Sequence, residues 1–192
     1  MKKLLTLAAL AVFALVLTGC PKDVPAGGSD PNNGDITSAY DLTVDLSVAK
    51  HVLADWAVGW GEGTNNTKYA NGKLTIACGN GWANSTEIAL DADLSEYKTI
   101  TVKGAAKGWE ADGALKIALY SADGGATEFT KDWGEGFFEF DATTKETSMN
   151  LADGGTLYGA EAAADLSSIT KVVINPQGGT GTLEIEAIGF NK

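Results

Sequence analysis

Residues 165–190, DLSSITKVVINPQGGTGTLEIEAIGF, decide the fold. Two segments in it, ITKVVINP (169–176) and GTLEIEAIGF (181–190), mix apolar with polar residues at a period near two. That period is typical of strands with one buried face. Gly178-Gly179 lies between the segments and offers the positive φ angles that tight connections require. The stretch therefore predicts two strands that belong to an antiparallel sheet.

The same pattern recurs along the chain between turn signals such as Asn71-Gly72, Asp123-Gly124-Gly125 and Asp153-Gly154-Gly155. The further segments are YDLTVDL (40–46), KLTIACG (73–79), STEIALD (85–91), YKTITVKG (97–104), ALKIALYS (114–121), FFEFDA (137–142) and ETSMNL (146–151). Nine or ten short strands at this spacing predict an all-β, antiparallel sandwich or barrel. Two segments are ambiguous. We expect a strand preceded by a loop or single turn in 47–56, and at most two or three helical turns in 158–168.

The N-terminus has the features of a secretory signal followed by a tether. Residues 1–19 combine Lys2 and Lys3 with an apolar run that is too short for a spanning helix. The run ends in Leu17-Thr18-Gly19-Cys20, which resembles the lipobox of bacterial lipoproteins and implies lipidation of Cys20. Residues 20–36 are rich in Pro, Gly, Asp and Asn, so they predict a flexible linker. We expect one folded domain over residues 37–192.

The resemblance to a lipoprotein implies a lipid-anchored protein of the bacterial cell envelope. Pro21 and Lys22, rather than an aspartate, follow Cys20, which favours the outer membrane or cell surface over the inner membrane. Lipidation of the Cys20 thiol would leave Cys78 without an intramolecular disulfide partner. The alternation of KLTIACG indicates that Cys78 is a buried strand thiol.

Charge restricts the class of partner. All 14 basic residues are lysines and they face 25 acidic residues, for a formal charge of −11 that becomes about −13 without the signal. Nucleic acids and anionic polysaccharides require a basic surface, usually with arginines, so we expect neither as a ligand.

The sequence also argues against catalysis. His51 is the single histidine, and no G-x-S-x-G nucleophile motif is present. One histidine with one buried cysteine cannot form a zinc site. Asp132 and Glu135 are carboxylates three residues apart in one loop, whereas a glycosidase needs two acids that face each other across a cleft. We therefore expect a protein that is not an enzyme.

The D-L-S starts at 93 and 165, the strand ITKVVINPQGG and the closing strand GTLEIEAIGF resemble the galactose-binding-like jelly rolls among carbohydrate-binding modules. The resemblance spans roughly residues 40–190. It implies a jelly-roll sandwich that binds a glycan. It further implies a structural calcium site with Glu186 from the last strand and Asp41 or Asp45 from the first as oxygen ligands.

The tryptophans are the candidate ligand contacts. Indole faces stack on the apolar faces of sugar rings, while amides and carboxylates nearby bind the hydroxyls. Trp56 alternates with small neighbours and is expected in the core, whereas the others lie in Gly- and Asn-rich loops. The candidate site comprises Trp60, Trp82, Trp109 and Trp133, with Asn65, Asn84 and Asp132 beside them.

These residues are compatible with two functions, of which the first is the leading hypothesis. The first is the binding of a neutral polysaccharide or oligosaccharide by a lipid-anchored module. The second is a structural or adhesive surface lipoprotein whose aromatic residues contact a protein partner or another copy of the chain.

Overall fold

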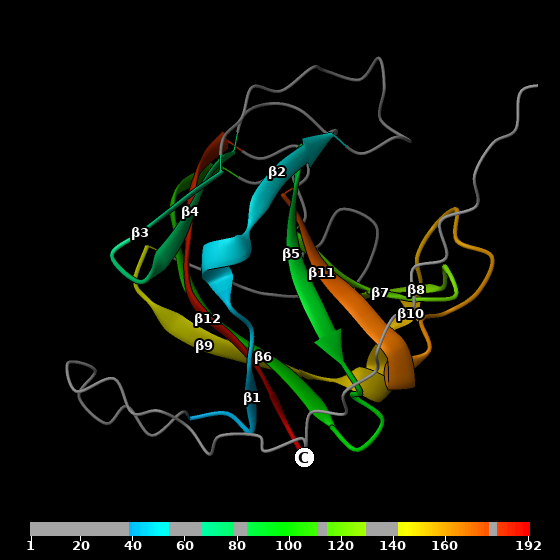
Figure 1. Cartoon of the computed structure of the whole chain (residues 1–192). Coiled ribbons are helices and arrows are strands. Elements are labelled where there is room, and N and C mark those ends of the chain that lie inside the picture. The colour runs from blue at the N-terminus through cyan, green and yellow to red at the C-terminus, as the bar shows by residue number, and fades with distance from the viewer. Residues whose placement is uncertain (1–38, 54–66, 79–83, 111–114, 130–141, 177–179) are drawn as a thin grey trace, which may run out of the picture. The chain divides into compact units, whose positions relative to one another are not determined.

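The structure is a computed structural model, and it describes residues 39–53, 67–78, 84–110, 115–129, 142–176 and 180–192. Within these residues the strands form two antiparallel sheets that lie face to face (Figure 1). Sheet A has the order β3-β4-β12-β6-β9, and β1 also pairs with β12. Its strands are β1 (Leu42–Thr43), β3 (Thr67–Ala70), β4 (Lys73–Cys78), β6 (Thr99–Glu110), β9 (Lys145–Asn150) and β12 (Thr180–Asn191).

Sheet B has the order β10-β8-β7-β11-β5-β2. Its strands are β2 (Lys50–Leu53), β5 (Asn84–Ala92), β7 (Leu115–Ser121), β8 (Ala126–Phe129), β10 (Gly155–Thr156) and β11 (Ile169–Pro176). Short 3₁₀ turns occur at η1 (Leu46–Val48), η3 (Leu151–Asp153) and η4 (Leu166–Ser168). The chain passes repeatedly from one sheet to the other, which is the connectivity of a jelly-roll sandwich.

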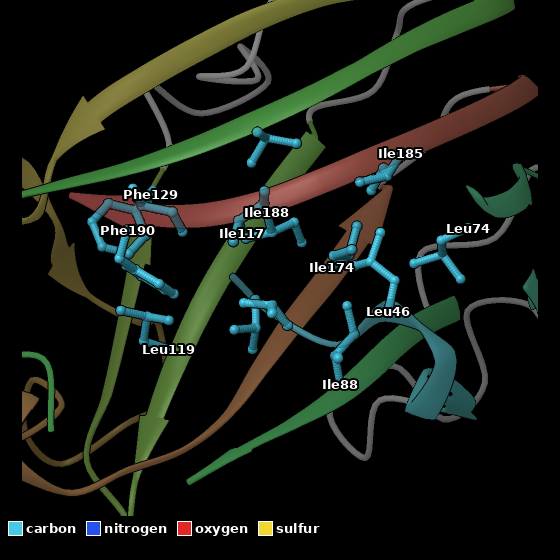
Figure 2. Close-up of a cluster of buried hydrophobic side chains, with 14 of the residues drawn as sticks. Leu46, Leu74, Ile88, Ile117, Leu119, Phe129, Ile174, Ile185, Ile188 and Phe190 are labelled. Atoms are coloured by element: carbon cyan, nitrogen blue, oxygen red, sulfur yellow. The ribbon is translucent and has the colours of Figure 1, made fainter. Parts of the chain in front are cut away.

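The core lies between the two sheets. Figure 2 shows side chains of both sheets in this layer, among them Ile117 and Ile174 from sheet B and Ile185 and Phe190 from sheet A. All four are 0% exposed. The longer strands supply alternate residues to this layer, so the period of two in the sequence reflects burial of one sheet face.

Turn chemistry places the strands as the sequence indicates. Asn71 (φ 53°) and Gly72 (φ 74°) connect β3 to β4, with Ala70 paired to Lys73 across the turn. Both residues have the positive φ angles of a two-residue hairpin of type I′.

Three D-L-S segments form the same local structure, at 45–47, 93–95 and 165–167. In each, the aspartate accepts hydrogen bonds from the backbone N–H and hydroxyl of the serine two residues on, at 2.6–2.9 Å. This Asx turn directs the leucine between them toward the core. Two of the segments also contact each other, because the N–H of Leu94 donates to the carbonyl of Leu166 at 2.7 Å.

The prediction of an all-β antiparallel sandwich is confirmed. Of the twelve strands in the described ranges, ten have four or more residues. The strand expected after a turn in 47–56 is β2, which follows η1. Strands β3, β8 and β10 were not predicted. FFEFDA lies largely outside the described residues, and 158–168 forms no α-helix. Residues 37–192 form one compact unit. In the described ranges, we find no helix with the length and hydropathy to span a bilayer.

Candidate functional site

The outer face of sheet B is the candidate site. Ile88, Leu119 and Ile174 lie in the core, so their sequence neighbours point to the opposite side of the sheet. We call the outward set the sheet B face. It comprises Lys50 from β2; Ser85, Glu87 and Ala89 from β5; Lys171, Val173 and Asn175 from β11; Lys116, Ala118 and Tyr120 from β7; and Glu128 from β8.

The centre of the sheet B face is apolar and screened from solvent. Val173 in β11 pairs with Ala118 in β7 and with Glu87 in β5. Val173 and Ala118 are 8% and 5% exposed although they point away from the core. The centre of this face therefore combines small apolar side chains with low accessibility.

Three lysine–glutamate ion pairs lie beside this apolar centre. The ammonium group of Lys171 contacts a carboxylate oxygen of Glu87 at 2.5 Å, and Lys50 lies 3.6 Å from the other oxygen. On the opposite side, Lys116 and Glu128 are 3.2 Å apart, with side chains only 19% and 16% exposed. Each carboxylate is thus matched by a lysine, and the face has little net charge.

Tyr120 is the aromatic residue of the sheet B face. The ammonium nitrogen of Lys171 lies 4.7 Å from the centre of its ring. Burial raises the pKa of Tyr120, and the negative charges of Glu87 and Glu128 raise it further. The phenol is therefore neutral at physiological pH and can both donate and accept a hydrogen bond.

Asn175 provides an unpaired polar group on this face. Asn175 and Ser85 are 7% and 4% exposed, and the Nδ2 of Asn175 donates to the Oγ of Ser85 at 2.6 Å. Within the described part of the chain, the Oδ1 of Asn175 is buried with no hydrogen-bond partner. Turning the amide over would use the same Ser85 hydroxyl and leave the nitrogen unpaired instead. A buried polar atom without a partner costs about 1–3 kcal/mol, and such groups are often functional.

The strand ends near Asn175 adjoin the segments that carry most of the predicted site. Leu53 at the end of β2 pairs with Asn84 at the start of β5, and Pro176 at the end of β11 pairs with Leu115. The connections 54–66, 79–83, 111–114 and 177–179 therefore begin at the same end of the sandwich, and 130–141 leaves β8 there.

Most of the predicted ligand contacts lie outside the described residues. These are Trp60, Asn65, Trp82, Asp132 and Trp133, and Trp56 lies there too. Trp109 belongs to β6 and Asn84 to β5, and the structure describes the backbone but not the side chain of each. The topology brings together the strand ends from which these segments start. The part of the tryptophans and of their polar neighbours in binding remains a prediction.

The three carboxylates predicted to hold calcium have separate partners. Glu186 lies 2.7 Å from the ammonium group of Lys73 and 3.5 Å from that of Lys103. The hydrogen bond from Lys73 and the positive charges of both lysines lower the pKa of Glu186. Asp41 accepts the backbone N–H of Lys192 at 2.9 Å, and Asp45 caps η1.

Among the described residues, no three His, Cys, Asp or Glu side chains are grouped so that they could hold a metal ion. The described residues therefore do not bring these three carboxylates together in one group. Calcium binding stays a prediction that calorimetric titration would test.

Sequence reasoning missed the sheet B face. Tyr120, Glu87, Lys171 and Asn175 all lie within segments that the sequence predicted as strands. The available signal was the outward half of each strand, where charged, aromatic and amide side chains alternate with core residues. Register between strands brings these residues together, and a single sequence does not reveal register.

Comparisons with known proteins agree with the fold. No family model matches the sequence, and no curated protein matches it. The structure is similar to the family 11 carbohydrate-binding module from Clostridium thermocellum in complex with a β-1,3-1,4-mixed-linked tetrasaccharide. The TM-score is 0.56 at 15% identity, and the match covers 78% of this chain and 94% of that chain.

A second similar structure is PfGH50B, with a TM-score of 0.54 at 13% identity. The match covers 80% of this chain but 24% of PfGH50B, so this chain corresponds to about a quarter of that protein. The family 11 module of the cellulosomal cellulase Lic26A-Cel5E of Clostridium thermocellum matches with a TM-score of 0.46 at 14% identity, covering 74% of this chain and 81% of that one. At these identities, the two matches with TM-scores above 0.5 show a shared fold.

Proposed function

We propose that this chain is a non-catalytic glycan-binding module that takes a neutral oligosaccharide or polysaccharide on the sheet B face. The observation that carries the proposal is the buried, unpaired Oδ1 of Asn175 on that face. A sugar hydroxyl could donate to this oxygen and remove the cost of leaving it unpaired. The fold similarity to a module solved with a mixed-linked tetrasaccharide supports the same class of ligand.

The remaining features of the sheet B face suit a neutral glycan. Tyr120 offers a partly exposed aromatic ring beside a hydroxyl, which suits the C–H surface of a sugar ring. The paired lysines and glutamates supply donors and acceptors for hydroxyl groups without strong net charge. Trp60, Trp82, Trp109 and Trp133 would add stacking contacts from the end of the sandwich next to Asn175.

We further propose that the module is a lipoprotein of the cell envelope, anchored through Cys20 on the outer membrane or cell surface. The support is the sequence alone: the basic and apolar signal, the LTGC motif and the spacer to residue 36.

The test is a titration of the full chain with the β-1,3-1,4-mixed-linked tetrasaccharide and with a panel of neutral oligosaccharides. Binding is measured by tryptophan fluorescence and by calorimetry. We expect saturable binding to one class of sugar. Asn175→Ala should weaken that binding by about tenfold or more, while the free energy of unfolding changes by about 1 kcal/mol or less.

Thr101→Ala is the matched control for this titration. Thr101 is also a buried polar residue that bonds to a neighbouring strand, at 2.7 Å from Ser148, but it belongs to sheet A. The affinity of Thr101→Ala for sugar should not change.

Full binding by the alanine variants of Trp60, Trp82, Trp109 and Trp133 would contradict a role for the tryptophans. No binding across the panel, together with capture of an envelope protein, would favour the protein-contact function.

A further inference from the structure

Tyr158 is presented to solvent by a loop that contains no other aromatic residue. Its exposed fraction is 90%, whereas Val48 and Tyr69, the other large exposed hydrophobic residues of the described ranges, reach 47% and 41%. The loop sequence from 155 to 165, GTLYGAEAAAD, contains one aromatic side chain. Burial in the sandwich does not account for a tyrosine here.

A tight turn fixes the position of Tyr158. The N–H of Ala160 donates to the carbonyl of Leu157 at 2.9 Å, which closes a four-residue turn with Tyr158 at its first corner. Gly159 at the second corner has φ 90°, as a type II turn requires.

The loop around this turn is bonded along its length to the β7–β8 hairpin. Backbone hydrogen bonds join Leu157 N–H to Ala126 C=O at 3.0 Å and Ala126 N–H to Ala162 C=O at 2.9 Å. The N–H groups of Ala164 and Asp165 donate to the hydroxyls of Thr127 and Ser121 at 2.9 and 3.0 Å. The backbone that carries Tyr158 is therefore already ordered before a ligand binds. Binding would not include the entropy cost of ordering this loop.

Tyr158 stands at the β10 edge of the sheet that carries the sheet B face. Lys171 pairs with Tyr120 and Tyr120 pairs with Ala126, to which Leu157 is bonded. These residues form one row across β11, β7, β8 and the segment after β10. With neighbouring strands about 4.8 Å apart, Leu157 lies roughly 10 Å from Tyr120 along this row. Tyr158 follows Leu157 in the chain, at the corner of the turn that closes this edge.

We propose that Tyr158 is an outer stacking contact for a glycan that lies across the strands of the sheet B face. This inference rests on the proposed function. A short oligosaccharide would occupy the sites near Tyr120 and Asn175, and a longer chain would continue past Ala126 to the exposed ring of Tyr158. Tyr158 thus sets a preference for chain length.

The experiment compares the mixed-linked tetrasaccharide with a mixed-linked octasaccharide, both titrated calorimetrically into the full chain. Tyr158→Ala should lower the affinity for the octasaccharide by about tenfold and leave that for the tetrasaccharide unchanged. Tyr158→Phe should keep the wild-type affinity, because the ring and not the hydroxyl makes the contact. Tyr69→Ala, which removes an exposed tyrosine from sheet A, should have no effect.

The failures of the two proposals are distinguishable. If the wild type binds both sugars and Tyr158→Ala binds them equally well, the role of Tyr158 is overturned and the proposed function stands. If the wild type binds neither sugar, both are overturned. Because Tyr158 is almost fully exposed, thermal unfolding of Tyr158→Ala should match that of the wild type, and a misfolded variant would be recognised by its melting curve.

Discussion

Gly189 in β12 leaves the space that the ring of Tyr40 occupies. A Cβ at position 189 would overlap the side chain of Tyr40, which also donates a hydrogen bond to Glu146. Gly189→Ala must therefore displace the ring of Tyr40. It must also disturb the pairing of Thr43 in β1 with residue 189. We expect a loss of about 1–3 kcal/mol in the free energy of unfolding, the usual cost of overpacking, measured by urea denaturation.

Gly155→Ala is the control for this substitution, since nothing lies within 4 Å of a Cβ built there. In a Tyr40→Ala background, Gly189→Ala should cost much less than it does alone. An equal cost in both backgrounds would mean that Tyr40 is not the group that excludes the methyl.

Single residues also show where sequence reasoning ends. The turn chemistry of Asn71-Gly72 was readable because positive φ angles demand particular residues. Gly154, expected to supply a positive φ, instead has φ −70°, and a Cβ there would lie 2.5 Å from Thr127 Cγ2. Glycine is required at position 154 because Thr127, 27 positions earlier in the chain, occupies the space of a Cβ. A contact between residues so far apart leaves no pattern in the local sequence.

At the scale of elements, strands were predictable where one face is buried. In the long strands β6, β11 and β12, core residues recur at every second position except at the register shifts between Ile169 and Lys171 and between Ile185 and Ala187. Strand β3 lies at a sheet edge with three of its four residues exposed, and β8 has three buried residues among four, so neither shows the alternation. For the candidate site, the strand segments were found, but the register that assembles the sheet B face was not.

Glu186 joins three strands of sheet A and makes their pairing sensitive to pH. It contacts Lys73 from β4 and Lys103 from β6, and the hydrogen bond from Lys73 is the main cause of its lowered pKa. A carboxylate whose pKa is lowered by folding stabilises the protein above its unfolded pKa, about 4.3, and loses that contribution as the pH falls further. The pairs are partly exposed, so the contribution should be about 1 kcal/mol or less.

We therefore expect Glu186→Gln to be less stable than the wild type at pH 7, and the difference should shrink as the pH is lowered through 4 toward 3. Urea denaturation of both proteins across this range measures it. Tenfold higher ionic strength should reduce the difference at pH 7. A difference that grows on acidification would contradict the assignment.

At the scale of the whole domain, the N-terminal attachment and the candidate ligand site lie at opposite ends of β12. Residue 41 is next to the C-terminus, because Asp41 accepts the N–H of Lys192 at 2.9 Å and β1 pairs with Phe190. The connections that carry Trp60 and Trp82 begin at the other end, where β12 starts. The twelve residues of β12 span roughly 36 Å.

This polarity predicts how an anchored domain meets the bilayer. If Cys20 carries the lipid, the end with the chain termini should lie on average nearer the membrane, and the ligand end should face away from it. A glycan outside the membrane would then reach the sheet B face without obstruction by the lipid surface.

The prediction is testable with a donor dye at Lys192→Cys or Lys107→Cys, each in a Cys78→Ser background of the lipidated chain in vesicles with acceptor-labelled lipid. Both lysine side chains are 53% exposed, and Lys107 pairs with Thr182 near the start of β12. Energy transfer should be stronger from position 192 than from position 107, because transfer falls steeply with distance. Equal transfer from the two positions would mean that the domain reorients freely on its spacer. Stronger transfer from position 107 would place the tryptophan-bearing connections against the bilayer. In that case these connections would contact the membrane instead of binding a glycan.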